Sequence, residues 1–318
     1  MTPVIETDRL TKYYGRARGV IDLDLEVRPG EVYGFLGPNG AGKTTTIRLL
    51  LDFIRPTGGR ATAFGLDVHR DSLAIRRRIG YLPGELTLYE SLSGRELLSY
   101  FAHLRRLPRD GRGEALAERL DCDLGREIRT LSHGNRQKLG LVQALMGDPE
   151  LAILDEPTLG LDPLVQLEFF RIVDELRAAG RTMFVSSHNL PEVERICDRV
   201  GIIREGRLLA VETVAGLKER AVRRLELRFA EAVPAAAFAD VPGVRDLVLD
   251  GPNLACVVVG PVDPVLRAAL RFRVEDVISH EPGLEEVFMA FYGGETGHAG
   301  DGQPPGEVAR DGEAPHAP

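Results

Sequence analysis

Eight consecutive residues near the start of the sequence have the types and spacing that bind nucleotide phosphates. They fit the pattern G-x-x-x-x-G-K-[ST] and are Gly37, Pro38, Asn39, Gly40, Ala41, Gly42, Lys43 and Thr44. Glycines let the backbone fold so tightly that successive N–H groups converge on one anion. In such a P-loop the lysine reaches the β- and γ-phosphates, and the threonine hydroxyl is a ligand of Mg²⁺. The segment therefore predicts a site for a nucleotide and its magnesium ion.

A pair of carboxylates follows an apolar run in the middle of the sequence. Residues 151–154 are Leu-Ala-Ile-Leu, the pattern of a central parallel strand buried on both faces, and Asp155 and Glu156 come directly after them. The carboxyl end of such a strand lies beside the P-loop, where Asp155 can hold the magnesium shell. Glu156 is then placed to orient or deprotonate an attacking water, which contributes roughly 10²–10⁴ in rate. Paired acids more often lie in a solvated turn, but the apolar run and Pro157 argue against that alternative.

The elements that must position these groups alternate between strand and helix. Residues 32–36 predict a short buried strand before the P-loop, and residues 45–51 a helix whose first residue, Thr45, joins the predicted phosphate-binding set. Further strands are expected around residues 20–27, 60–64, 151–154 and 182–186. This alternation favours an α/β fold, a P-loop NTPase with a parallel sheet covered by helices.

Residues 131–138, LSHGNRQK, resemble the signature motif, usually LSGGQ, of the ATP-binding subunits of ABC transporters. The resemblance implies that Ser132 and Gly134 bind the γ-phosphate of an ATP held by the opposite subunit. The resemblance also implies a homodimer that binds ATP and Mg²⁺ at the interface between its two copies. The sequence departs from the family at His133, which replaces the first glycine, and at Asn135, which replaces glutamine.

Other family positions match one by one. Tyr14 resembles the aromatic residue that stacks on adenine, with Tyr13 as the competing candidate. Asp162, in Gly-Leu-Asp, resembles the D-loop residue that acts across the dimer. His188 follows the next apolar strand along the chain after the one that precedes Asp155. It resembles the switch histidine that contacts the γ-phosphate. The resemblance thus implies a catalytic set of Glu156, His188 and Lys43.

One family position is not matched. After residues 79–83 the family has a glutamine that joins the metal and the water to the transporter interface, whereas this sequence has Gly84 and then Glu85. Glycine offers no side-chain ligand. Either Glu85 or a water is expected to take that place, and Glu85 would supply a hard oxygen ligand. The predicted metal ligands are therefore Thr44, Asp155 and Glu85.

Composition narrows the protein class. The chain has 318 residues and a formal net charge of −8, so no basic field indicates nucleic-acid binding. Its three cysteines, Cys122, Cys197 and Cys256, form no CxxC pair, which favours a reducing compartment. No run approaches the roughly 20 apolar residues of a membrane span. We expect a cytoplasmic protein that attaches peripherally to the cytoplasmic face of the membrane through an integral membrane permease subunit.

The sequence predicts three parts. Residues 1–214 carry all the nucleotide motifs, and within them a helical subdomain at about 85–145 would, by the resemblance, receive the membrane subunit. Residues 215–292 alternate as βαββαβ, which predicts a small ferredoxin-like α+β domain. Residues 293–318 are rich in Gly, Pro, Glu and Ala and predict a disordered tail.

The segment at residues 281–288, EPGLEEVF, resembles the end of ATP-binding subunits that serve antibiotic and multidrug exporters. The resemblance implies an ATP-hydrolysing subunit that powers efflux of a drug-like or antibiotic compound through a separate permease. The alternative is a soluble, non-transport ABC ATPase. A nucleotide-sensing regulator without turnover is disfavoured because Glu156 and His188 are both present.

Overall fold

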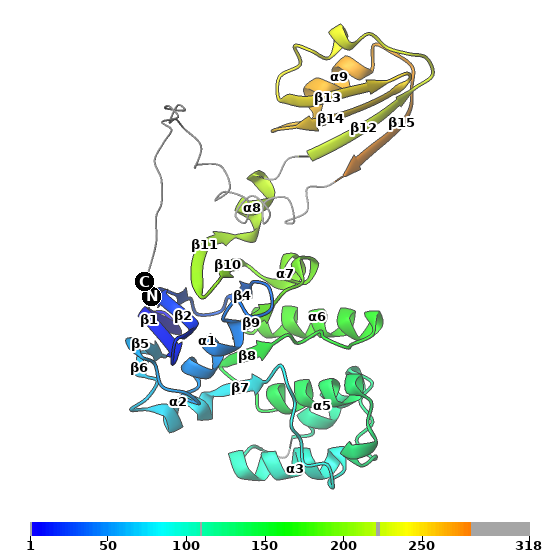
Figure 1. Ribbon diagram of the computed structural model, residues 1–318. Coiled ribbons are helices and arrows are strands. Elements are labelled where there is room, and N and C mark those ends of the chain that lie inside the picture. The colour runs from blue at the N-terminus through cyan, green and yellow to red at the C-terminus, as the bar shows by residue number, and fades with distance from the viewer. Residues whose placement is uncertain (1, 109, 221–222, 281–318) are drawn as a thin grey trace, which may run out of the picture.

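A six-stranded sheet forms the centre of the N-terminal part of the chain (Figure 1). The structure is a computed structural model that describes residues 2–108, 110–220 and 223–280. The strand order is β11-β10-β4-β9-β8-β7, with the bounds β4 Val32–Leu36, β7 Ile79–Leu82, β8 Leu151–Asp155, β9 Thr182–Ser187, β10 Arg199–Arg204 and β11 Arg207–Thr213. All are parallel except β11, which pairs antiparallel with β10. The predicted parallel sheet is therefore present.

Alternate residues of the central strands face two separate hydrophobic cores. In β4, Val32 and Leu36 belong to one core, whereas Tyr33 and Phe35 belong to the other. Successive side chains of a strand point to opposite faces, so a sheet covered on both sides needs an unbroken apolar run. Every residue of β4 and of β8 is buried, in agreement with that pattern.

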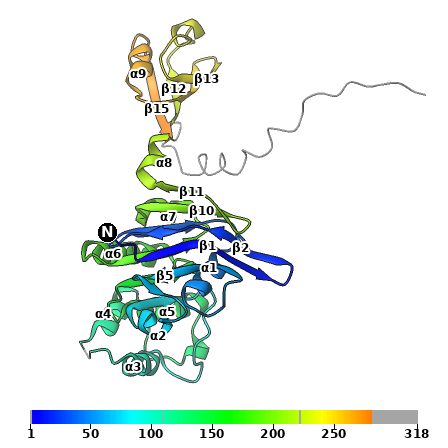
Figure 2. The ribbon, with the colours of Figure 1, turned by 90° about the vertical axis from the view of Figure 1, so that its left-hand side faces the viewer.

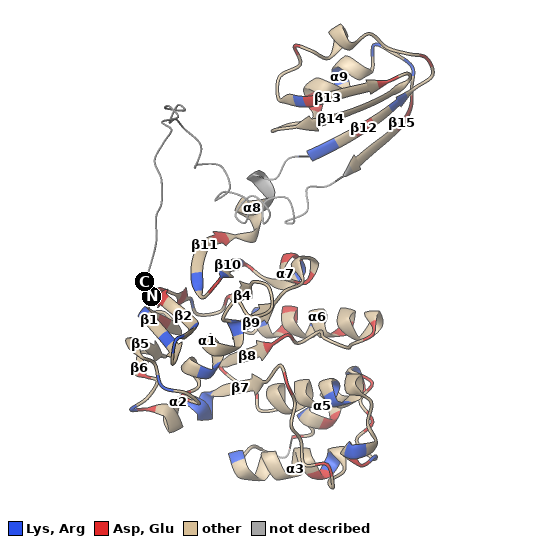
Figure 3. Ribbon diagram, viewed as in Figure 1, with Lys and Arg blue, Asp and Glu red and all other residues tan. Residues whose placement is uncertain are grey.

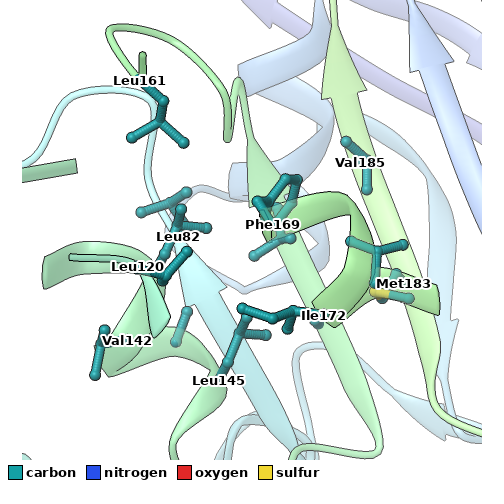
Figure 4. Packing of buried hydrophobic residues seen from close by; sticks show 14 of the residues in the cluster. Leu82, Leu120, Val142, Leu145, Leu161, Phe169, Ile172, Met183 and Val185 are labelled. Atoms are coloured by element: carbon teal, nitrogen blue, oxygen red, sulfur yellow. The ribbon is translucent and has the colours of Figure 1, made fainter. Parts of the chain in front are cut away.

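Helices cover both faces of this sheet. The first core packs the sheet against α5 (His133–Leu145), α6 (Pro163–Ala178) and α7 (Leu190–Ile196), with Phe169 of α6 close to Met183 and Val185 of β9 (Figure 4). The second core packs the opposite face against α1 (Lys43–Leu50). The helix predicted at residues 45–51 thus begins two residues earlier, at the P-loop lysine itself.

A second, antiparallel sheet lies over α1, which the strand–helix alternation did not predict (Figure 2). Its order is β2-β1-β5-β6, with β3 also on β1. The strands are β1 Ile5–Tyr14, β2 Ala17–Leu23, β3 Glu26–Val27, β5 Gly58–Ala63 and β6 Leu66–Asp67. The strand expected at residues 20–27 is split in two here, and Val27 of β3 pairs with Ile5 of β1.

The segment expected to be helical contains α3 (Gly94–Arg105), α4 (Arg112–Arg119), the 3₁₀ turn η1 (Ile128–Thr130) and α5. It is preceded by α2 (Ser72–Arg78). Helix α3 starts at a capping box, in which Ser93 and Glu96 each bond the other's backbone N–H. None of the helices in the described part of the chain has the length and apolar composition needed to cross a membrane.

After α8 (Val214–Arg220), the C-terminal elements form a separate antiparallel sheet of order β13-β14-β12-β15. They are β12 Arg223–Phe229, η2 Ala235–Ala237, β13 Val244–Asp250, β14 Asn253–Val258, α9 Asp263–Ala269 and β15 Val274–His280. A third core, which includes Phe229 and Phe238, fills this unit. The first helix predicted here is only the single turn η2. Residues 281–288 and 293–318, which carry the exporter resemblance and the predicted tail, lie outside the described residues.

Candidate nucleotide-binding and hydrolysis site

The P-loop connects the end of β4 to the start of α1. Gly42 caps α1 with a left-handed φ of 113°, and a Cβ there would lie 2.9 Å from the carbonyl oxygen of Gly19. A Cβ on Gly37 would lie 2.4 Å from the carbonyl oxygen of Ile203. Side chains are therefore excluded at both positions. No side chain caps α1 and no acidic residue lies in its first turn, so its N–H groups and positive end remain available for an anion.

Lys43 points back into its own loop. Its ammonium group donates to the carbonyl oxygen of Gly37 at 2.6 Å and lies 3.2 Å from Oε1 of Glu156. The side chain is 6% exposed, and a charge buried this far needs such partners. The lysine thus joins the P-loop to the end of β8.

Thr44 and Asp155 meet between α1 and β8. The Thr44 hydroxyl donates to Oδ2 of Asp155 at 2.8 Å, and the Ser186 hydroxyl of β9 donates to the other carboxylate oxygen. Asp155 is buried, and Ser186 stands opposite it in the parallel register. These contacts fix the carboxylate beside the threonine hydroxyl, so two hard oxygen atoms converge at the mouth of the P-loop.

Both oxygens of the Glu156 carboxylate have partners. Oε1 faces Lys43, and Oε2 lies 2.8 Å from Nδ1 of His188, which follows β9. An ionised carboxylate only accepts hydrogen bonds, so Nδ1 carries the hydrogen in this contact. Glu156 itself has a φ of 52°, a left-handed conformation that is unfavourable for a residue with a Cβ.

A buried acid that the sequence motifs did not indicate bonds the residue before His188. Glu192, on α7, is 3% exposed, and its Oε2 accepts a hydrogen bond of 2.6 Å from the Ser187 hydroxyl. Burial raises the pKa of Glu192 to about 7, against the lowering effect of hydrogen bonds from Ser187 and Thr158. The sequence offered one signal, an acid four residues after His188 on a helix with an apolar inner face.

The signature motif begins helix α5. Ser132 is the N-cap, and its hydroxyl accepts hydrogen bonds from the backbone and the side-chain amide of Asn135, at 3.3 and 3.1 Å. The substituted Asn135 therefore stabilises this cap. The next residue, His133, packs on Gly160, where a Cβ would lie 2.7 Å from the imidazole Cδ2.

The D-loop lies against the same helix. A Cβ on Gly134 would come within 2.6 Å of the carbonyl oxygen of Gly160, so only glycine fits at both positions. Asp162 caps α6 by accepting from the backbone N–H of Val165, and Lys138 of α5 lies 3.8 Å from Oδ2 of Asp162. The signature segment and the D-loop thus contact each other within one chain. No hydrogen bond or ion pair joins Ser132 or Gly134 to the P-loop in the described residues.

The geometry distinguishes the two tyrosines at the end of β1. Both are exposed. A Cβ on Gly19 would lie 3.1 Å from Cε2 of Tyr14 and 3.0 Å from the Thr45 methyl group, so Tyr14 and Thr45 flank the same point. Lys12 lies over the Tyr14 ring, at 5.3 Å from its centroid. Tyr14, rather than Tyr13, is therefore next to the P-loop helix.

The position of the missing family glutamine is also beside the site. A Cβ on Gly84 would lie 3.1 Å from Oδ2 of Asp155. The adjacent Glu85 is exposed, and no contact joins it to Asp155 or Thr44 in the part of the chain that the structure describes. Within the same residues, no group of three or more His, Cys, Asp or Glu side chains is arranged to hold a metal. Glu85 as a metal ligand therefore stays a prediction.

The structure brings together five of the predicted residues, Lys43, Thr44, Asp155, Glu156 and His188, from the P-loop and the ends of two neighbouring parallel strands. A phosphate-binding loop, a pair of oxygen ligands and a held carboxylate are the parts that phosphoryl transfer to water requires. The fold and the site therefore define a P-loop NTPase.

The comparisons with known proteins identify the family. The sequence model described as "ABC transporter" matches residues 20–159. The bacitracin transport ATP-binding protein BcrA of Bacillus licheniformis is 40% identical over 234 residues, which cover 73% of this chain and 76% of the relative. The daunorubicin resistance ATP-binding protein DrrA3 of Streptomyces coeruleorubidus is 36% identical over 302 residues, which cover 91% of this chain and 96% of the relative. The chain belongs to the ATP-binding proteins of the ABC transporter family and resembles those of its antibiotic and drug resistance branch.

Solved structures agree on the fold. An ATP-binding subunit of an ABC transporter superposes with a TM-score of 0.63 at 30% identity, over 68% of this chain and 92% of that chain. A dimeric ATP-binding cassette with ADP and phosphate gives a TM-score of 0.61 at 20% identity, over 66% of this chain and 98% of that chain. This protein is accordingly an ATP-binding subunit, and ATP hydrolysis is the activity expected of its family.

Proposed function

We propose that this chain hydrolyses ATP to power efflux of a drug-like or antibiotic compound through a separate integral membrane permease. Two copies form a homodimer at the cytoplasmic face of the membrane and enclose two ATP molecules. The observation that carries the proposal is the carboxylate of Glu156, held between Lys43 and His188 next to the Thr44–Asp155 pair.

The nucleotide would be bound by the P-loop backbone, Lys43 and Tyr14. The open N-terminus of α1 and the excluded side chains at its glycines support phosphate binding. An exposed tyrosine next to Thr45 supports adenine stacking, because a flat aromatic face at that position can cover a base.

Magnesium fits the same site. Thr44 and Asp155 offer hard oxygen atoms 2.8 Å apart, the ligand type that Mg²⁺ prefers, and the ion keeps several waters when only one or two protein groups bind it. When bound, the ion neutralises charge on the phosphate oxygens. Glu85 is the proposed further ligand in place of the family's glutamine. If Glu85→Ala changes neither the magnesium dependence nor the turnover number, that assignment is wrong.

Glu156 would orient the attacking water and accept its proton. A general base contributes roughly 10²–10⁴ in rate when it is held within hydrogen-bond reach of the proton. The contacts from Lys43 and His188 support this role, since they limit the directions that the carboxylate can take. His188 would in addition contact the γ-phosphate.

The second half of each ATP site would come from the other copy, through Ser132, Gly134 and Asp162. The contact between the signature segment and the D-loop within one chain supports a single docking surface built from both. Each ATP would then be an interfacial ligand, so that dimer closure and nucleotide affinity are linked. Acidic and basic side chains are mixed along most elements (Figure 3), and with a net charge of −8 this gives no support to a nucleic-acid partner.

The direction of transport and the class of cargo rest on the relatives, which are named for bacitracin transport and daunorubicin resistance. The test is a search of the neighbouring genes for a membrane protein and its co-expression with this chain, followed by ATP-driven daunorubicin and bacitracin transport in membrane vesicles. We expect transport with the wild-type chain and none with Glu156→Gln. ATP hydrolysis without transport of either compound, and without a membrane protein partner, would favour a non-transport ATPase instead.

The extents of the three parts also remain proposals, at residues 1–214, 215–292 and 293–318. We propose that the C-terminal α+β unit stabilises the dimer or restrains the nucleotide-binding parts. Its own hydrophobic core supports an independently packed module. Deletion of residues 220–318 with unchanged dimer formation, ATPase rate and export would exclude this role.

A further inference from the structure

A buried glutamine on the signature helix holds the backbone of Glu156. Gln137 lies in the second turn of α5, and its side chain is 2% exposed. Its Nε2 atom donates to the carbonyl oxygen of Glu156 at 3.1 Å and to that of Pro157 at 3.2 Å. An amide nitrogen has two hydrogens, so both donors are used on two successive carbonyls of one loop.

These carbonyls belong to a strained turn. Glu156 has a φ of 52°, and residues with a Cβ keep such a conformation only when the surrounding structure enforces it. The backbone N–H of Leu159 also bonds the carbonyl oxygen of Glu156, at 3.2 Å, which closes the turn from within. Gln137 supplies the bonds from outside the turn. Without them, two carbonyls in a buried region would each lose a donor.

The two ends of Glu156 are thus fixed by different elements. Lys43 and His188 hold the carboxylate, while Gln137 holds the backbone from which the side chain projects. Helix α5 starts after its N-cap Ser132, so the signature segment lies at the N-terminus of this helix. The side-chain amide of Gln137 lies one turn later on the same helix. A small shift of the helix must therefore move the backbone of Glu156.

We propose that Gln137 is a positioning residue for Glu156, through which the signature helix of each chain sets the direction of that chain's own carboxylate. The inference rests on the proposed role of Glu156. It assigns a function to the third residue after the LSHG segment, which the motif analysis left unexplained. Gln137 touches neither nucleotide nor water in this scheme and acts only through the loop it holds.

The test uses two substitutions in the full-length chain. Gln137→Met keeps the length and the apolar stem but removes both donors, and Gln137→Glu keeps the shape but presents oxygen atoms to the two carbonyls. We expect kcat for ATP hydrolysis to fall about tenfold to a hundredfold, as for a misplaced catalytic group. The KM for ATP and the Kd of a fluorescent ATP analogue should stay within about threefold of wild type, because nucleotide contacts are unchanged.

The matched control is Gln143→Met on the same helix. Gln143 is partly exposed and makes no bond to the Glu156 loop in the described residues, so kcat should stay within about twofold of wild type. The two Gln137 variants differ in charge and polarity, so loss of folding in one still leaves the other to be measured, with thermal unfolding as the check.

A double substitution separates positioning from a general structural role. If Gln137 acts through Glu156, then Gln137→Met should reduce the residual rate of Glu156→Gln by less than about twofold, because the group it positions is already absent. A full multiplicative loss in the double variant would overturn the inference, as would wild-type kcat in both Gln137 variants. Failure of the proposed function gives a different result, in which Glu156→Gln itself hydrolyses ATP at the wild-type rate.

Discussion

Nδ1 of His188 lies 2.8 Å from Oε2 of Glu156, so the residues that directly follow two neighbouring parallel strands contact each other. The strands β8 and β9 end at the same edge of the sheet, and each is followed at once by one of these side chains. The contact places an imidazole on one oxygen of the carboxylate while Lys43 lies beside the other. The direction of the carboxylate is therefore set by the sheet and the P-loop together.

His188→Ala should lower kcat by roughly tenfold to a hundredfold, because Glu156 loses one of its two side-chain partners and becomes free to rotate. ATP affinity should fall less than kcat, since the P-loop contacts remain and only the contact from His188 to the γ-phosphate is lost. Steady-state ATPase assays and nucleotide titrations measure both quantities. His103→Ala, an exposed histidine on α3, is the control. Unchanged kcat in His188→Ala would show that the contact does not matter for turnover.

Glu156→Gln should retain ATP and accumulate as an ATP-bound dimer. The amide has nearly the same shape but no longer accepts a proton, so hydrolysis should fall roughly 10²–10⁴-fold. Light scattering coupled to size exclusion, with and without ATP and Mg²⁺, reports the dimer, and nucleotide extraction reports whether ATP or ADP is bound. A strictly monomeric variant under saturating ATP, even with the permease present, would remove the interfacial site from the proposal.

Thr44→Val should raise the magnesium concentration needed for half-maximal activity about tenfold, because one of the two adjacent oxygen ligands is lost while the side-chain volume is kept. Thr44→Ser keeps the hydroxyl and should restore the wild-type dependence. Removal of the metal with a chelator should abolish hydrolysis in all three proteins. Equal magnesium dependence of the valine and serine variants would contradict the role assigned to Thr44.

Tyr14→Ala should weaken ATP binding about fivefold to thirtyfold, because stacking of an aromatic ring on a base contributes on the order of 1–2 kcal/mol. Tyr13→Ala is the matched control, an exposed tyrosine one residue earlier on the same strand, and it should bind ATP nearly as wild type. Isothermal titration of ATP measures both. If Tyr13→Ala has the larger effect, the assignment of the adenine-stacking residue is reversed.

Glu192→Gln should change the pH dependence of stability. Because the pKa of Glu192 is raised to about 7 in the folded protein, the folded state binds more protons than the unfolded state between about pH 4.5 and 7. The wild-type free energy of unfolding therefore falls as pH rises through that window, by up to about 3 kcal/mol from this group. The glutamine does not titrate. Denaturant unfolding at pH 5 and pH 8 should show the variant gaining stability relative to wild type at the higher pH. An equal difference in the free energy of unfolding between variant and wild type at both pH values would contradict the raised pKa of Glu192.

The central strands were predictable because burial on both faces leaves a signature in the sequence. The strand expected at residues 32–36 has the bounds of β4, and the apolar run before Asp155 is β8. Since chemistry in such sheets collects at the carboxyl ends of parallel strands, Asp155, Glu156 and His188 could be placed near the P-loop from order alone. Short local patterns were enough for this part of the site.

The antiparallel sheet was not predictable in the same way. Its strands are half-buried, and β1 alone pairs with β2, β3 and β5, which are separated from it by up to about fifty residues of chain. A strand in which buried and exposed residues are mixed has no continuous apolar run in its sequence. The register in which such strands pair depends on which face of the sheet the rest of the fold covers. The first helix of the predicted βαββαβ pattern is likewise only the single turn η2.

By itself, the sequence determined the phosphate loop, the acid pair and the order of the buried strands, because these features depend on residue types at fixed spacing along one element. Only the tertiary structure decided which side chains hold Glu156. Lys43, His188 and Gln137 come from three different elements, and the buried Glu192 bonds the residue before His188. No spacing rule connects residues that meet across a core, since their contacts depend on how the helices pack on the sheet.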